Sequence, residues 1–375
     1  MKNHITPFSV LVLEDDINLF VFVVHCLSQI KGINIYVLSN KKDTETKYSR
    51  KIKKYIFYNK PPSELEWISN IDFEVDKHHI DLVMPVNEQE IETLLKYQDQ
   101  FKNRDKLVIL PTLDAFYKAN DKGLLAEHLK KHQIPTPKSF LIKAGEKNIY
   151  NENLRFPILA KPTIGFYGGD GIIKFYDING VKLYLNNNNL AYDILLEEYV
   201  EGYDLCCNIL CEKGKILAFT IQKGLLWTEK PFSPQIALEF IYDEKLYDTV
   251  KKLMKSLNWS GVANIDIRFD YKTKQFVILE INPRFWLSTE ASEMVGVNFP
   301  YLLCLSSLNV DFELPNYKHK KILNLKGLSY MTKMNKTFVF KFKFICNNTP
   351  IKYYLKDPLP LIYIISNKIK SMMKN

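Results

Sequence analysis

Short apolar runs alternate with longer amphipathic segments along roughly the first hundred residues of the chain. The runs predict strands, and the periodic segments between them predict helices. Strands are expected over Ser9–Glu14, Asn34–Leu38, Asp81–Val86 and Lys106–Leu110, and helices over Asn18–Lys31 and Glu88–Phe101. Strands that are apolar throughout are typical of a parallel sheet covered on both faces. The N-terminal region is therefore predicted to be an α/β unit.

The pattern changes after residue 111. An amphipathic segment begins at Thr112 and is closed by Pro135 and Pro137, which predicts helical structure followed by a turn. Short strands, a glycine cluster and a helix over Asp243–Asn258 follow. This mixture predicts an α+β unit behind the first.

Polar side chains interrupt the apolar strand FVILEINPRFW at residues 276–286. If Tyr271–Gln275 form a hairpin turn and pairing is regular from there, Asp266 faces Glu280. Asn282 then lies on the same face as Glu280, because side chains alternate along a strand. Facing like charges destabilise a sheet. We therefore expect a cation between them.

The residues that converge on this face are hard oxygen ligands, as Mg²⁺ prefers. The expected metal ligands are Asp266, Glu280 and Asn282. Arg268 and Arg284 flank the same row and are placed to hold phosphoryl oxygens. The alternative is a set of ordinary salt bridges.

A strand carrying Lys161 runs into a glycine-rich loop. Gly165, Gly168, Gly169 and Gly171 allow positive φ, so that consecutive amides can point at phosphate oxygens. A plain flexible turn is the alternative. Four glycines within seven residues, from 14 in the whole chain, favour phosphate binding.

Two further segments add to this set. Lys122 is expected at the start of a helix. The segment ILLEEYVEGYDL, residues 194–205, carries Glu197, Glu198, Val200 and Asp204 at the end of a strand. Such a segment can bind adenine through its backbone and a carboxylate, with Asp204 at a ribose hydroxyl. An acidic surface turn explains it equally well.

Two familiar interpretations of the N-terminal unit fail. A dinucleotide site needs a glycine turn after the first strand, but Glu14, Asp15 and Asp16 stand there. A receiver domain needs an aspartate at the end of a later strand, where this chain has Asn87 and Glu88. The acidic loop is either a solvated helix cap or a substrate-facing loop.

Charge and composition change the picture little. The formal net charge is +9, but lysines occur along the whole chain, so we expect no nucleic-acid partner. The richness in Lys, Asn, Ile and Tyr indicates a general compositional bias, and a cradle for phosphorylated small molecules accounts for the basic excess as well. The C-terminal segment PLPLIYIISNKIKSMMKN either packs back on the protein or makes peripheral contact with an anionic membrane.

Other residue types carry weaker signals. The six cysteines contain no CxxC pair and are expected to be packing residues, which together with the lack of a leader indicates the cytoplasm. His128 and His132 have metal-ligand spacing but are expected on a solvated helix face. Trp227 and Trp286 hint at an apolar or ring-bearing substrate.

The order of these motifs closely resembles the ATP-grasp superfamily, and within it the carboxylate–amine ligases and carbamoyl-phosphate-synthase-like members. The most specific part is EINPRF after GVANIDIRFD. The resemblance implies a Rossmann-like pre-ATP-grasp domain with a parallel sheet over 1–111. It further implies a two-subdomain ATP-grasp fold over 112–308, with a lid at about 138–198, and leaves 309–375 as a basic C-terminal extension.

The resemblance also implies a role for each motif residue. Lys122 and Lys161 would bind ATP phosphates, and Gly168, Gly169 and Gly171 would close over them. Glu197 and the backbone of Glu198 to Val200 would hold adenine, and Asp204 the ribose. Asp266, Glu280 and Asn282 would coordinate one or two Mg²⁺, with Mn²⁺ as a substitute. Arg284, with Arg268, would act on the transferring phosphoryl group.

The implied activity is an ADP-forming ligation, in which ATP phosphorylates a small-molecule carboxylate and an amine or other nucleophile attacks the acyl phosphate. A carboxylating or thioester-forming enzyme and a non-catalytic nucleotide-binding protein are the alternatives, and an oligomer is compatible with each. The sequence departs from the family at QKGLLWTEKPFSPQIALEF, which lacks a glycine pair, and at Phe285 and Trp286. Both departures fall where the acceptor substrate should bind.

Overall fold

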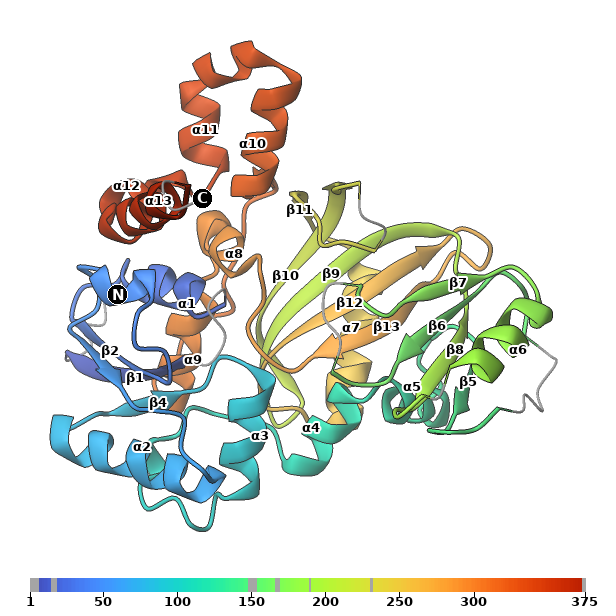
Figure 1. Cartoon of the computed structure of the whole chain (residues 1–375), viewed down its shortest axis with the longest axis horizontal. Coiled ribbons are helices and arrows are strands. Elements are labelled where there is room, and N and C mark those ends of the chain that lie inside the picture. The colour runs from blue at the N-terminus through green and yellow to red at the C-terminus, as the bar shows by residue number, and fades with distance from the viewer. Residues whose placement is uncertain are drawn as a thin grey trace.

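The computed structural model describes residues 7–14, 19–147, 154–165, 169–188, 190–229 and 232–372 of the 375-residue chain. The strands of this part form one parallel and two antiparallel sheets (Figure 1). The predicted combination of an α/β unit and an α+β unit is confirmed.

The N-terminal sheet is parallel, in the order β3-β2-β1-β4. Its elements are β1 (Phe8–Glu14), α1 (Leu19–Leu27), β2 (Ile33–Ser39), η1 (Glu45–Tyr48), β3 (Lys54–Phe57), α2 (Glu64–His78), β4 (Leu82–Met84), α3 (Glu88–Lys96) and η2 (Arg104–Lys106). Val10 and Val12 pack into one buried cluster, and Leu11 and Leu13 pack into another. Both faces of β1 are therefore covered, which explains its unbroken apolar run.

One predicted strand of this sheet is wrong. Lys106–Leu110 makes a single parallel bridge, from Leu107 to Val83, instead of a strand. The amide of Ile109 donates to the hydroxyl of Ser307 at 2.9 Å, so the segment leaves the sheet after one pair.

The predicted helical stretch after Thr112 is two helices, α4 (Leu113–Asn120) and α5 (Lys122–Lys131). Asp121 separates them: its backbone is extended, and its side chain accepts a hydrogen bond from the amide of Leu124. Lys122 therefore begins α5, as the sequence predicts.

A small antiparallel sheet follows, in the order β5-β8-β6-β7. It consists of β5 (Ser139–Ile142), β6 (Ile158–Pro162), β7 (Ile173–Phe175) and β8 (Ile194–Glu198), with α6 (Ile178–Asn187) on one face. In Figure 1 this sheet lies beyond the large sheet, at the opposite end of the molecule from the N-terminal unit.

The large antiparallel sheet has the order β13-β12-β9-β10-β11-β14. Its strands are β9 (Gly202–Glu212), β10 (Lys215–Leu226), β11 (Ala237–Ile241), β12 (Gly261–Asp270), β13 (Phe276–Asn282) and β14 (Lys320–Leu323). Helix α7 (Glu244–Leu257) buries Val250 and Leu253 against Ile209 and Ile265 on one face. Leu210 and Val262, on the other face, belong to the core of the N-terminal unit.

The remaining helices follow β13, and β14 lies between α9 and α10. They are α8 (Thr289–Val295), α9 (Phe299–Ser307), α10 (Leu325–Met334), η3 (Lys336–Phe340), α11 (Phe342–Asn348), α12 (Ile351–Lys356) and α13 (Leu359–Met372). Residues beyond 308 thus also supply an edge strand of the large sheet. Among the described residues, no helix combines the length and apolarity needed to cross a bilayer.

Candidate active site

Asp266 and Glu280 face each other across the β12–β13 hairpin, as the sequence pattern predicts. The regular pairing assumed from the turn onward is wrong, because Ile267 pairs with Ile278. A bulge at Leu279 then shifts the register by one residue and brings the two carboxylates opposite each other. Without the bulge, they would lie on opposite faces of the sheet.

The two carboxylates share one electrostatic environment. Desolvation, and then the charge of Glu280, raises the pKa of Asp266 to about 7. Desolvation is also the largest single influence on Glu280, but Lys122, a hydrogen bond with Asp266 and the charge of Lys161 together outweigh it and lower the pKa of Glu280 to about 2. The Lys122 Nζ atom lies 3.2 Å from Glu280 Oε2. The pair is therefore poised to hold a proton or a cation at neutral pH.

Asn282 is fixed by a chain of amide hydrogen bonds. Its Nδ2 donates to Asn264 Oδ1 at 3.2 Å, and Asn264 Nδ2 donates to Asn208 Oδ1 at 2.8 Å. Asn208 is fully buried, with its Nδ2 3.3 Å from Thr220 Oγ1. The same nitrogen lies 3.5 Å from Asp266 Oδ2, and the oxygen of Asn282 accepts from Arg284 Nη2 at 3.2 Å.

Lys161 and Glu197 form a buried ion pair between neighbouring strands β6 and β8. Their side chains are only 8% and 5% exposed, so each charge is compensated chiefly by the other. The charge of Lys161 also lowers the pKa of Glu280 and acts on Asp204. Lys161 therefore lies at the centre of the predicted set, with Glu197 as its direct partner.

Arg268 and Asp204 pair across strands β12 and β9, with Arg268 Nη1 3.0 Å from Asp204 Oδ1. The guanidinium also donates to the hydroxyl of Tyr199 at 3.1 Å and lies over that ring. Desolvation raises the pKa of Asp204 in spite of this partner. Arg268 therefore lies at the end of the row where the small and large sheets meet.

Arg284 lies at the other end of the row. Its Nε lies 2.5 Å from Glu88 Oε1, and its Nη2 donates to Asn282 Oδ1 at 3.2 Å. Glu88 is the first residue of α3, so the N-terminal unit contributes directly to this end of the site. The sequence reasoning singled out Arg284 but not its partner.

The glycine loop has the conformation expected from its composition. Gly165, Gly169 and Gly171 all have positive φ, at 82°, 81° and 72°. A Cβ atom on Gly169 would lie 2.4 Å from the carbonyl oxygen of Phe232, so the two segments approach each other closely. Gly168 lies outside the described residues, as do Asp15 and Asp16.

The segment after β8 joins the small sheet to the large one. Glu198 donates its amide to the carbonyl of Lys138 at 2.9 Å, and its side chain accepts from the amide of Arg155 at 2.9 Å. Val200 lies in the connection between β8 and β9. Glu198 and Val200 thus lie at the end of β8 and in the connection from the small sheet to the large one.

Sequence reasoning missed one neighbour of the carboxylates. Cys206 lies opposite Asp266 on β9, and its Sγ donates to Asp266 Oδ1 at 3.0 Å. Desolvation raises the pKa of this thiol well above its usual range. The sequence did contain a signal for this contact, because Cys206 lies two residues after Asp204 and therefore on the same face of β9.

Three weaker expectations are wrong. Trp286 is 3% exposed and packs on Phe299, so it is a core residue and not a substrate contact. His128 is buried against Ser256 instead of solvated. Five cysteines are buried, but Cys346 is exposed and is not a packing residue.

Comparison with known proteins agrees with this geometry. Residues 119–288 match the family described as ATP-grasp domain. Biotin carboxylase 1 of Bacillus subtilis is 25% identical over 202 residues, covering 49% of this chain and 44% of that protein. D-aspartate ligase of Enterococcus faecium is 21% identical over 216 residues, covering 51% and 50%. The chain therefore spans half or less of the length of these two relatives.

Among solved structures, the ADP complex of N5-carboxyaminoimidazole synthetase from Staphylococcus aureus superposes with a TM-score of 0.68. It is 15% identical, and the match covers 88% of this chain and 87% of that one. At this identity the likeness concerns the fold. The family match shows an ATP-grasp domain over residues 119–288, and the likeness in fold extends over most of the chain.

Proposed function

We propose that this protein is an ATP- and Mg²⁺-dependent ligase that activates a carboxylate as an acyl phosphate and couples it to an amine or another nucleophile. The observation that carries the proposal is the convergence of Lys122, Lys161, Asp266, Glu280 and Asn282 on one face where the two antiparallel sheets meet. ADP and phosphate are the expected products.

The donor set fits a divalent cation. Asp266 and Glu280 face each other at a separation where like charges repel, and the pKa of Asp266 is raised to about 7 as a result of desolvation and of that repulsion. Asp266, Glu280 and the oxygen of Asn282 would hold Mg²⁺. When bound, the metal supplies charge neutralisation for the phosphates.

The cationic residues would divide the remaining work. Lys122 and Lys161 would bind phosphate oxygens. Lys122 now pairs with Glu280 and Lys161 with Glu197, so each lysine would leave its carboxylate or contact the carboxylate and the phosphate together. Arg284, at the acceptor end, would stabilise charge on the transferring phosphoryl group. Asp204 and the segment 197–200 would receive ribose and adenine.

The glycine loop would exclude water from the acyl phosphate. Gly169 lies against Phe232, which belongs to the connection between β10 and β11 of the large sheet. Closure at this point would protect the intermediate from hydrolysis.

The test is ATP consumption with Mg²⁺ over a panel of amino acids, uronic acids and other carboxylates, each with and without amines, and with hydroxylamine as a trap. We expect ADP, phosphate and a hydroxamate for the correct carboxylate. Glu280→Ala should lose all three, and Glu212→Ala, at the exposed end of β9, is the matched control. Release of AMP and pyrophosphate would contradict the proposed chemistry.

A carboxylating reaction is the second candidate. It is favoured by the similarity to biotin carboxylase 1 and to N5-carboxyaminoimidazole synthetase. In that case bicarbonate takes the place of the organic carboxylate. ATP turnover that requires bicarbonate, with ¹⁴C transfer to an acceptor, would select this candidate over the first.

A further inference from the structure

The positive charge of this protein is concentrated at one end of the chain. Residues 314–375 contain 13 lysines and a single acidic residue, Asp357, a net charge of +12. Residues 1–313 contain 38 lysines and arginines and 41 acidic residues, a net charge of −3. The nucleotide site therefore does not account for the basic excess, which belongs to the C-terminal helices.

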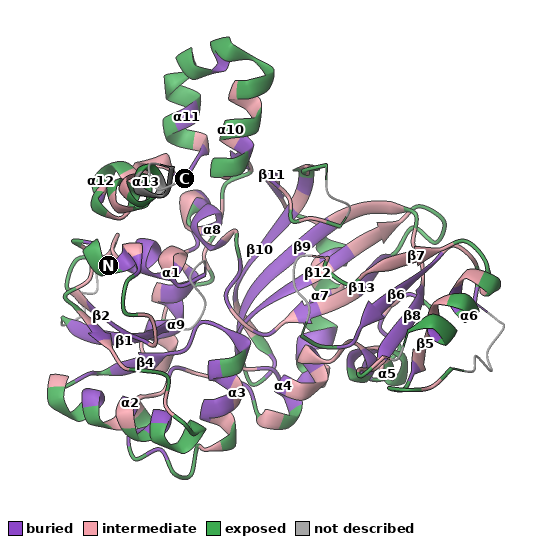
Figure 2. Ribbon diagram, viewed as in Figure 1, coloured by how far each residue is buried: buried purple, intermediate pink, exposed green. Residues whose placement is uncertain are grey.

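Part of this basic segment projects from the body of the protein. Helices α10 and α11, joined by η3, extend away from both neighbouring units, and most of their residues are exposed (Figures 1 and 2). Lysines lie exposed along and around the tip of this hairpin: Lys326, Lys333, Lys336, Lys341 and Lys343. No carboxylate among the described residues forms an ion pair with any of these five.

Large apolar side chains accompany the lysines at the tip. Phe340 is 72% exposed, Met334 71% and Phe342 68%, and Val339 lies between them, also exposed. Phe340, Phe342 and Phe344 line a shallow hollow together with Lys341 and Lys343. Exposed apolar surface of this extent marks an interaction site on a folded protein.

Helix α13 adds a second exposed apolar surface. Leu361, Ile365 and Ile369 are exposed at intervals of four residues, with Ile362 beside them, and form one apolar stripe. This stripe and the hairpin tip are separate surfaces on the same basic segment. A membrane-active helix combines such a stripe with lysines.

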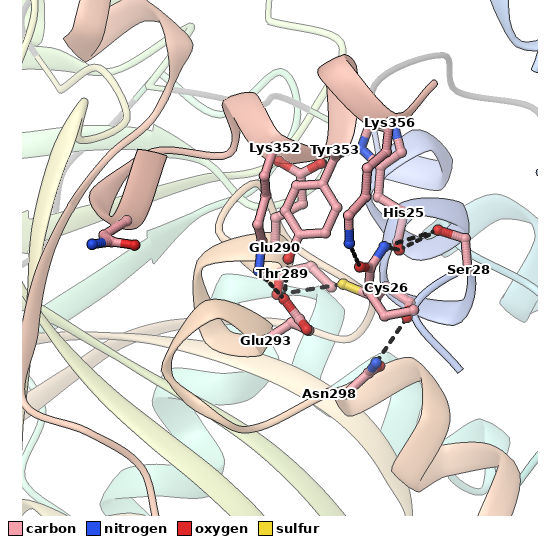
Figure 3. Close-up of polar contacts among 12 residues, drawn as sticks. His25, Cys26, Ser28, Thr289, Glu290, Glu293, Asn298, Lys352, Tyr353 and Lys356 are labelled. Atoms are coloured by element: carbon pink, nitrogen blue, oxygen red, sulfur yellow. Dashed lines mark hydrogen bonds and ion pairs between the residues drawn. The ribbon is translucent and has the colours of Figure 1, made fainter. Parts of the chain in front are cut away.

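Polar contacts between α12 and α8 attach the basic segment to the rest of the protein (Figure 3). Tyr353 of α12 donates a hydrogen bond to Glu293 of α8, and Lys352 Nζ lies 3.3 Å from the same carboxylate. Glu290, one turn earlier on α8, pairs with His25 of α1.

A second contact fastens the start of α13. Asp357, which is 3% exposed, accepts a hydrogen bond from the hydroxyl of Ser49. The only acidic residue of the basic segment is thus turned inward, and the outward surface carries a single sign of charge.

We propose that the two apolar surfaces of the basic segment, the tip of the α10–α11 hairpin and the stripe of α13, dock on an anionic lipid membrane. The lysines match the negative surface of such a membrane, and the phenylalanines and isoleucines match its acyl interior. A second copy of this chain would bring two surfaces of the same sign together, which opposes self-association. Nucleic acid would leave the aliphatic side chains of α13 without a partner, because bases stack on aromatic rings and not on isoleucine.

The experiment measures binding of the full chain to sonicated vesicles by co-sedimentation, with phosphatidylglycerol and phosphatidylcholine mixed, against phosphatidylcholine alone. We expect binding to the anionic vesicles only, weakened by salt. Replacing Lys333, Lys336, Lys341 and Lys343 with alanine should lower the partition coefficient about 100- to 1000-fold, because each lysine near an anionic surface contributes about fivefold. The control replaces Lys245, Lys251, Lys255 and Lys272 with alanine, which removes the same charge from exposed positions elsewhere. This control should change the partition coefficient less than about tenfold.

An uncharged variant tests the apolar part separately. Phe340→Ser with Phe342→Ser should lower the partition coefficient at least about tenfold at unchanged net charge. Its control is Leu65→Ser with Phe73→Ser, two exposed apolar residues of α2. Thermal unfolding of each variant shows that the fold is kept.

Equal binding to neutral and anionic vesicles, no binding to either, or equal losses in the test and control variants would overturn the proposal. So would tighter binding of mixed-sequence DNA or RNA through the same four lysines at the same salt concentration. None of these readouts depends on the proposed ligase activity.

Discussion

The ammonium group of Lys122, at the first residue of α5, lies 3.2 Å from a carboxylate oxygen of Glu280 on β13. This contact keeps one member of the Asp266–Glu280 pair ionised, while the pKa of the other is raised to about 7. The ammonium group of Lys122 thus offsets part of the negative charge of the carboxylate pair, and a bound metal would offset the rest.

Removal of this lysine should weaken nucleotide binding. We expect Lys122→Met to raise the Kd for Mg·ADP about 10- to 100-fold, since one charge-assisted contact to phosphate is worth about 1.5–3 kcal/mol. Isothermal titration calorimetry measures this directly. Lys131→Met, at the exposed end of the same helix, should bind as the unaltered protein does.

The raised pKa of Asp266 predicts a pH dependence of stability. Its folded pKa, about 7, lies above its ordinary value of 3.8, so the folded state binds a proton that unfolding releases between these values. Without Mg²⁺, the free energy of unfolding should therefore fall as the pH rises from about 4 to about 7, by about 1–2 kcal/mol after allowance for partial solvent screening.

Urea denaturation at several pH values measures this fall, and Asp266→Asn should flatten it. Addition of Mg²⁺ should restore stability most strongly above pH 7, because metal binding then displaces no proton. A fall of the same size in Asp266→Asn would assign the pH dependence to another group.

The amide chain behind Asn282 should be important for both stability and metal affinity. Asn264→Ala removes the donor to the buried Oδ1 of Asn208 and the best acceptor of the Asn282 nitrogen, and we expect a loss of about 1–3 kcal/mol in the free energy of unfolding. Because Asn282 then loses its orientation, the affinity for Mg²⁺ should fall too, in calorimetric titration with Mg·ADP. A stability loss with unchanged metal affinity would limit this chain to a structural role.

The glycine loop offers a test with a matched control. Gly169→Ala places a Cβ atom 2.4 Å from the carbonyl oxygen of Phe232 at a positive φ of 81°. We expect weaker nucleotide binding, by about tenfold, with a small change in Tm. Gly145 has a similar φ of 75° but no atom within 4 Å of an added Cβ. Gly145→Ala therefore shows the effect of backbone strain alone, without loss of a close contact such as that between Gly169 and Phe232. Equal effects of the two substitutions would contradict a role for this contact.

The sequence allowed much of the fold and part of the site to be predicted. Strands buried on both faces, such as β1, and the alternation along β12 and β13 are local patterns that packing enforces. The facing of Asp266 and Glu280 was predicted correctly, although the regular register used to derive it was wrong near the turn. The bulge at Leu279 has no distinct sequence signal.

Contacts between distant segments could not be predicted. Glu88 meets Arg284 because α3 begins beside the end of β13, a matter of how the N-terminal unit packs on the sheet. Trp286 had an aromatic character that suits a substrate site or a core equally well, and only its burial against Phe299 decides between them. The ion pair of Lys161 with Glu197 depends on the adjacency of β6 and β8, which are separated in sequence by another strand and a helix.

The most direct test of the central claim is the Mg²⁺ dependence of nucleotide binding in the unaltered protein and in Glu280→Gln, which keeps shape and removes charge. We expect Mg·ADP to bind the unaltered protein and Glu212→Gln alike, and Glu280→Gln at least about 30-fold more weakly, a difference of about 2 kcal/mol. Binding that is equal in all three proteins, or that is unchanged by chelation of Mg²⁺, would contradict the assignment of this face as the metal–nucleotide site.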